Sequence, residues 1–162
     1  MSKFVKLLSW AAALYITIIF LDSLRFKFTG HPTPEHIFTT LREWSGIGLF
    51  YPAGPWAIGL AELASSLLVL VLPAIFWLRK QPRNLARSQF LGALIGLGVM
   101  SGAIVFHLFT PLGIDTPTEW NADGTAILAE GPLLFIMACG VWLASAFLLI
   151  YRGKQMKGGT PG

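Results

Sequence analysis

The chain has 162 residues, of which 54% are hydrophobic and only 12% are charged. Soluble domains carry about 25% charged residues, so this chain has too little polar side chain to cover a surface that faces water. The formal net charge of +4 does not indicate nucleic acid as a partner, because Lys and Arg flank long apolar blocks, as they do in membrane proteins. The expected partner of this surface is a lipid bilayer.

Four apolar blocks are the main feature of the sequence. A helix needs about 20 mainly apolar residues to cross the hydrocarbon core, and the blocks that approach or exceed this length are residues 4–21, 56–78, 90–112 and 132–151. Lys3 and Lys6 precede the first block as in a signal peptide, but no small-x-small cleavage pattern follows Leu21, which favours a retained span. The sequence therefore predicts an all-α membrane protein, with residues 1–152 forming an antiparallel bundle of four transmembrane helices.

The positive charges predict the orientation. The N-terminus, the second connection and the C-terminal tail carry Lys3, Lys6, Arg79, Lys80, Arg83, Arg87, Arg152, Lys154 and Lys157. Lys and Arg concentrate on the cytoplasmic side of membrane proteins. We therefore expect both termini in the cytoplasm, and the first and third connections outside.

The connections are predicted from their turn and cap residues. In the outer loop, residues 22–55, a short amphipathic helix is expected at about 34–45, with Thr33 as its cap, Pro34 at its first position and Gly46 at its end. Its apolar face, which should lie at the membrane surface, is formed by Ile37, Leu41 and Trp44. The third connection is polar and rich in turn residues, and the tail at 153–162 is predicted to be disordered.

Two ionisable residues lie within the predicted spans, Glu62 and His107. Such residues are costly in a membrane and usually face the bundle interior. Glu62 shares a face with Gly59 and Ser66, and His107 shares one with Gly92, Gly96 and Ala103; small residues on both faces would let the two helices approach closely. We expect Glu62 and His107 to come within hydrogen-bond reach as a proton-carrying or substrate-binding pair. The alternative is a structural pair that only fixes helix register.

Other polar residues near this pair extend the candidate site. Lys27 and Arg25 follow the first span and could form a cationic lip for an anionic group, although such clusters are also common at plain interfaces; Ser66 completes the candidate binding residues. His31, Glu35 and His36 match no known spacing of metal ligands, so no metal site is predicted. Cys139 is the single cysteine, which excludes an intrachain disulfide and a Cys-x-x-Cys redox pair.

Several short motifs occur in an order that resembles the DoxX-like family of small four-span membrane proteins. They are Lys27-Phe28-Thr29-Gly30, Ala61-Glu62-Leu63, Arg83 with Leu85 and Ala86, and Phe106-His107-Leu108-Phe109. The resemblance implies a four-helix bundle in the inner (plasma) membrane. It also links the chain to relatives that oxidise sulfur compounds with quinone as acceptor, or that serve in thiol-redox and oxidative-stress assemblies. The lone Cys139 departs from any thiol-active relative.

Three functions follow from these residues and the resemblance. The first is a redox-linked subunit that binds a quinone or another small molecule at Glu62 and His107, without a covalently bound cofactor and with electrons supplied by a partner subunit or by the substrate. The second is a membrane assembly or binding protein without turnover, which packs against itself as a homo-oligomer or against a partner. The third is a small-molecule or proton transporter with Glu62 as the proton carrier. The sequence leaves open whether the protein is an enzyme.

Overall fold

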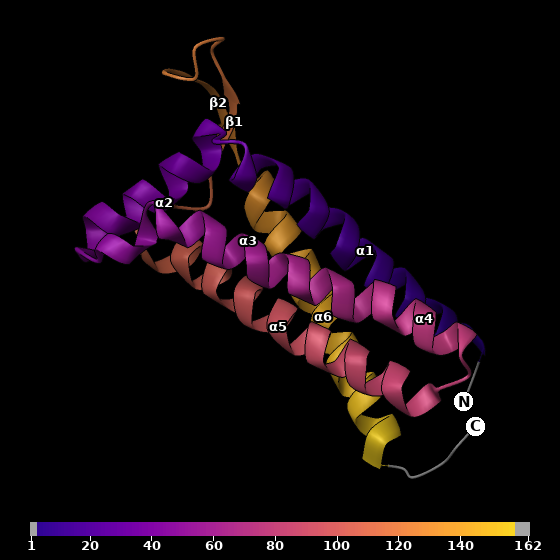
Figure 1. Cartoon of the computed structure of the whole chain (residues 1–162). Helices are drawn as coiled ribbons and strands as arrows, with labels where there is room; N and C mark the ends of the chain where they lie inside the picture. Colours follow the sequence, from indigo (N-terminus) through magenta and orange to yellow (C-terminus); the bar gives the residue numbers. More distant parts are fainter. Residues whose placement is uncertain (1–2, 158–162) are drawn as a thin grey trace.

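The fold is that of a helical membrane bundle, seen in a computed structural model that describes residues 3–157 (Figure 1). Within these residues, 4 helices are long and apolar enough to cross a membrane: Lys3–Phe28, Ala53–Leu78, Pro82–Phe109 and Leu133–Lys157. At a rise of about 1.5 Å per residue, each is longer than the roughly 30 Å hydrocarbon core. The predicted all-α, four-helix architecture is confirmed.

The labels of the helices follow their order in the chain. The first crossing is α1 (Lys3–Phe28), the third is α5 (Pro82–Phe109) and the fourth is α6 (Leu133–Lys157). The second crossing consists of α3 (Ala53–Ser66), a π-helical segment η2 (Leu67–Val71) and α4 (Leu72–Leu78). Between the first two crossings lie α2 (Pro32–Ser45) and the short 3-10 turn η1 (Gly48–Phe50).

The helices are longer than the apolar blocks that predicted them. Helix α1 continues from Leu21 to Phe28, and α6 continues to Lys157. The prediction of a disordered tail is therefore wrong for residues 153–157, and residues 158–162 lie outside the described part of the chain. Hydropathy shows where a chain leaves the lipid, whereas a helix continues as long as its residues tolerate helical geometry.

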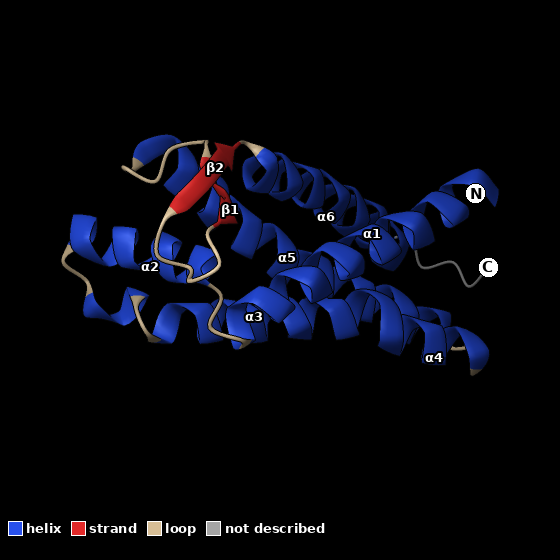
Figure 2. Ribbon diagram, turned by 90° about the horizontal axis from the view of Figure 1, so that it is seen from above, coloured by secondary structure: helices blue, strands red, loops and turns tan. Residues whose placement is uncertain are grey.

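The two ends of the bundle differ in what they carry. Helix α2 and the third connection lie at one end, which we call the loop end, and both termini lie at the other, the terminal end (Figures 1 and 2). The turn between α4 and α5 also lies at the terminal end. Both termini on one side is what four crossings require.

Helix α2 begins and ends close to the predicted positions. Gly46 ends it in the left-handed conformation, with φ 71° and its N–H bound to the carbonyl of Arg42. The predicted cap is wrong: Nδ1 of His31 accepts the N–H of Thr33 at 3.2 Å and takes that role. The buried face consists of Pro34, Phe38 and Leu41. Trp44, which was predicted to lie with Ile37 and Leu41 on an apolar face at the membrane surface, is 53% exposed.

The third connection forms a β-hairpin that the sequence analysis did not predict. Strand β1 (Thr116–Trp120) pairs antiparallel with β2 (Ile127–Gly131). In the turn, the side-chain oxygen of Asn121 accepts the N–H groups of Thr125 and Ala126. Trp120 donates its indole N–H to Thr33 Oγ1 at 2.8 Å, which holds the hairpin against α2.

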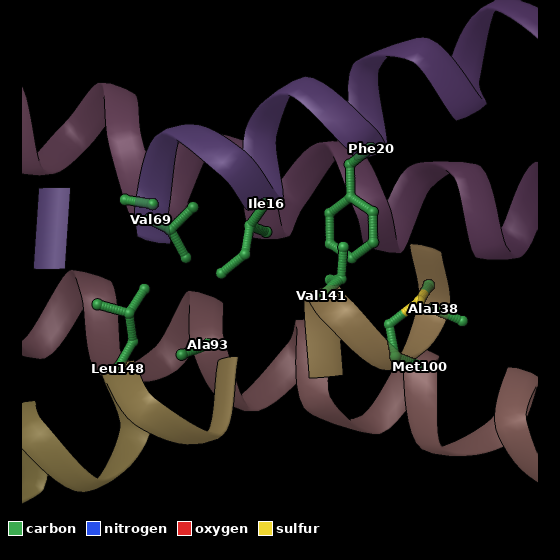
Figure 3. Packing of buried hydrophobic residues seen from close by; sticks show 9 residues of the cluster. Ile16, Phe20, Val69, Ala93, Met100, Ala138, Val141 and Leu148 are labelled. Atoms are coloured by element: carbon green, nitrogen blue, oxygen red, sulfur yellow. The ribbon is translucent and has the colours of Figure 1, made fainter. Parts of the chain in front are cut away.

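The core of the bundle is small because most of each helix faces outward. Figure 3 shows buried side chains from all four crossings: Ile16, Phe20, Val69, Ala93, Met100, Ala138, Val141 and Leu148. Only 22% to 33% of the most apolar window of each crossing is buried inside the bundle. The outward-facing remainder includes large apolar side chains such as Leu60, which is 58% exposed. Lipid is the solvent that such a surface requires.

The π-helical segment η2 follows from Pro73, which has no N–H to donate to the carbonyl of Val69 one turn earlier. The side-chain amide of Gln89 on α5 donates to that carbonyl instead, at 2.9 Å. The N–H of Leu72 binds the carbonyl of Leu67, and Ser88 Oγ donates to the carbonyl of Leu68 at 2.8 Å. Side chains of α5 thus satisfy the carbonyls that the irregular helix leaves open.

Candidate functional site

A cavity of about 420 Å³ lies at the loop end of the bundle, between α1, α2, α3, α5, α6 and β1. Its volume falls within the range of about 300–1,000 Å³ typical of small-molecule sites. Most of its wall is apolar, with Phe38 and Ile37 contributed by α2 and Met137 by α6. Among the polar residues on the wall are Ser23, Lys27, Glu62 and His107.

An ion pair between Lys27 and Glu62 forms one part of this wall. Nζ of Lys27 lies 3.0 Å from each carboxylate oxygen of Glu62. Lys27 also donates to Ser23 Oγ, and Ser23 is 3.5 Å from Glu62 Oε1. Ser23 and Lys27 are four residues apart on α1 and therefore share one face of that helix. The Glu62 side chain is 2% exposed and that of Lys27 is 13% exposed, so the pair is held largely away from solvent.

Glu62 faces α1 because Gly59, one turn before it on α3, lets α1 pack closely against this face. A Cβ added to Gly59 would lie 2.6 Å from Phe28 and 3.3 Å from Leu24, so α1 packs directly against this face of α3. The expected hydrogen bond between Glu62 and His107 does not form among the described residues. The prediction was wrong because the Glu62 face of α3 packs against α1, whereas the small residues of α5 meet the second crossing elsewhere, at Ser65 and Val69.

His107 lies on the wall of the same cavity and has a different partner. It is 6% exposed, and its Nδ1 is 2.6 Å from the carbonyl oxygen of Gly113. A carbonyl can only accept, so Nδ1 carries the hydrogen in this contact. The ring also meets Phe135 edge-on, with centroids 5.7 Å apart. The structure thus brings Glu62 and His107 to one cavity without joining them.

The other predicted binding residues have separate positions. Arg25 pairs with Asp22 at 3.0 Å, is 68% exposed and does not line the cavity. Ser66 donates to the backbone carbonyl of Glu62 at 2.9 Å and also lies outside the wall. Of the predicted binding residues, Lys27 alone is on the wall, and Glu62 balances its charge. An anionic ligand would have to compete with Glu62, which disfavours the predicted cationic lip.

Two glycines of α5, Gly98 and Gly102, lie on the cavity wall. A Cβ added to Gly98 or Gly102 would meet nothing within 4 Å. At Gly92 on the same helix, the added Cβ would lie 2.7 Å from the side chains of Leu68 and Val69. The spacing of the glycines does not distinguish those that pack against a neighbour from those that border a cavity.

His31, Glu35 and His36 serve different parts of the loop end. His31 lines the cavity and caps α2, whereas Glu35 and His36 line a second, more open hollow beside Trp120.

Comparison with family models, curated proteins and solved structures finds no match to this chain. The resemblance to the DoxX-like family therefore stays a prediction.

Proposed function

We propose that the protein binds a small, largely apolar molecule in the cavity at the loop end and exchanges protons with it, as a redox-linked subunit of the plasma membrane. A quinone is the candidate ligand that the resemblance names. The loop end would face outward and both termini the cytoplasm, in agreement with the positive charges of the terminal end. Electrons would come from a partner subunit or from the substrate.

The observation that carries this proposal is an ion pair on the wall of an apolar cavity within a membrane bundle. Charged groups are expensive at membrane depth and usually mark a ligand or proton pathway. A buried ion pair is also weak support for stability, because desolvation offsets much of its attraction. A purely structural bundle would gain little from Lys27 and Glu62 beside a cavity.

The chemistry of the wall suits a ligand that gains and loses protons. Glu62 can take up a proton, and Lys27 and Ser23 already hold its carboxylate in place. The His107 ring is a second group able to carry a proton. The apolar side chains of α2, α5 and α6 offer a dry surface for a ring, which matches the general composition of cofactor sites.

Co-purification from native membrane tests the proposal. The protein is extracted in its own lipid, and bound quinone is quantified per protein by mass spectrometry. We expect quinone with the native protein and a drop of about tenfold or more in Gly102→Leu. A Cβ at this position meets nothing within 4 Å, and the rest of the leucine side chain would occupy cavity volume. Glu62→Gln should lower the amount as well.

Ser66→Ala is the matched control, because Ser66 touches the backbone of Glu62 but not the cavity. Its quinone content should equal that of the native protein. Equal quinone in all of these variants would mean that the quinone is dissolved in the lipid, and the proposal would fail.

A further inference from the structure

The His107 ring on the cavity wall has one nitrogen without a hydrogen bond among the described residues. The Nδ1–H of His107 is bound to the carbonyl of Gly113 at 2.6 Å, so in the neutral form of the ring Nε2 is the nitrogen that can accept a hydrogen bond. Within residues 3–157, Nε2 forms no hydrogen bond. The side chain that carries it is 6% exposed and lines the cavity.

The charged groups on the wall are paired within the protein, Lys27 with Glu62 and Asp22 with Arg25. The ammonium of Lys27 can donate three hydrogen bonds, and its contacts are both oxygens of Glu62 and Ser23 Oγ. Nδ1 of His31 accepts the N–H of Thr33. A polar atom without a partner in the wall of a cavity can take that partner from a ligand. Nε2 of His107 can accept a hydrogen bond that the protein does not supply.

We propose that the cavity selects neutral molecules that carry a hydroxyl group on an apolar body, with the hydroxyl donating to Nε2 of His107. The inference rests on the proposed function and names the class of ligand. Neutrality follows from the charges: on the wall, Glu62 balances Lys27, and Asp22 is balanced by Arg25 at 3.0 Å. An oxidised quinone has carbonyl groups alone and leaves Nε2 unpaired, so the reduced quinol is the form of the candidate ligand that this contact favours.

Three probes of similar shape test this selection: β-naphthol, its methyl ether, which cannot donate, and β-naphthoate, which is anionic. Their binding to the full-length protein in lipid nanodiscs is measured by equilibrium dialysis against nanodiscs without protein. One hydrogen bond to a buried acceptor is worth roughly a five- to tenfold difference in affinity. We expect β-naphthol to bind about five- to tenfold more tightly than its ether, and the naphthoate to bind weakest.

Two variants of His107 separate ligand contact from packing. In His107→Asn, the amide can still donate to the carbonyl of Gly113 but no acceptor reaches the position of Nε2, so the preference for the hydroxyl should fall to about twofold or less. In His107→Gln, the longer side chain carries an oxygen toward that position, which should restore part of the preference.

The outcomes distinguish this inference from the proposed function. Equal affinity of the native protein for naphthol and ether, or an unchanged preference in His107→Asn, overturns the hydroxyl selection while cavity binding stands. If Gly102→Leu leaves the binding of both neutral probes unchanged, or if neither binds the native protein, the cavity is not a ligand site and both proposals fail.

Discussion

Both ends of the bundle bury a cation, and they treat it differently. At the terminal end, Arg152 is 6% exposed and donates to Gln89 at 2.7 Å, to Ser9 at 3.1 Å and to Gln155 at 2.6 Å. These neutral side chains come from α1, α5 and α6, so the guanidinium ties three helices together. At the loop end, Lys27 is held by a carboxylate, and the pair borders a cavity.

The difference separates a structural polar network from a candidate ligand site. Gln89 uses its amide N–H for the carbonyl of Val69 and its oxygen for Arg152, so this network completes the backbone of η2 and fixes the helices. At the loop end, Lys27, Glu62 and Ser23 bind one another, and Nε2 of His107 has no hydrogen bond within residues 3–157. Buried polar residues alone therefore do not indicate function; their position beside a cavity does.

Replacing Gln89 should have the largest effect on stability. Gln89→Leu removes the acceptor of Arg152 and the donor to Val69 together, which leaves a buried charge and a buried carbonyl without these partners. We expect the free energy of unfolding to fall by roughly 3–5 kcal/mol, measured by thermal denaturation in detergent. The matched control is Gln81→Leu, where an exposed side chain loses only a contact with Asn84; a similar loss there would contradict the structural role of Gln89.

Breaking the ion pair at the loop end should lower the free energy of unfolding by less than Gln89→Leu does. A second substitution in the pair should restore most of this loss. Lys27→Met leaves Glu62 as a buried carboxylate without its cation, and we expect a loss of roughly 2–3 kcal/mol. Adding Glu62→Gln removes the unpaired charge and should restore most of the stability. The double-mutant cycle, followed by thermal denaturation, measures the coupling. If the double variant is as unstable as the single one, the pair is part of the packing and the contrast between the ends is lost.

The sequence was sufficient for the bundle because lipid imposes a simple rule on composition. Long apolar blocks such as residues 56–78 must be helices when they cross a bilayer, and their number is readable without knowing any contact. The ends of the helices were less predictable: the polar residues after Leu21 continue α1 and place Lys27 one turn beyond Ser23. This continuation is what lets Lys27 reach Glu62.

Which side chains pair within the site depends on which helix packs against each face that carries small residues. Gly59, one turn from Glu62, and Gly96, on the predicted face of His107, both predict close packing, but the sequence does not say which helix packs against them. In the structure Gly59 packs on Phe28 of α1, and Gly96 packs on Ser145 and Ser65. Glu62 is therefore paired with Lys27, a candidate from the sequence, in an arrangement that the sequence analysis did not expect.

The glycines of α5 allow the same substitution to be compared at two places on one helix. In Gly92→Ala, the new Cβ would lie 2.7 Å from Leu68 and 2.9 Å from the backbone N of Val69, and overpacking of this kind costs roughly 1–3 kcal/mol. In Gly102→Ala, the Cβ meets nothing within 4 Å, and alanine should stabilise the helix by roughly 0.5–1 kcal/mol. Thermal denaturation of both variants tests this. If both substitutions lower the melting temperature, Gly102 packs against a neighbour and no cavity lies beside it.

The smallest expected effect is a dependence of stability on pH at the cap of α2. Burial and the nearby positive charge of Arg25 lower the pKa of His31 below its ordinary value of 6.5. The unfolded chain therefore binds the proton more readily, and stability should decline as the pH falls below 6.5 toward the lowered pKa. A protonated ring also cannot accept the N–H of Thr33, so the loss should be of the order of one helix cap, about 0.5–1 kcal/mol. His31→Asn, which caps without titrating, should remove this part of the pH dependence of the melting temperature. If the melting temperature of that variant depends on pH as it does in the native protein, protonation of His31 does not affect the stability of α2 at the cavity.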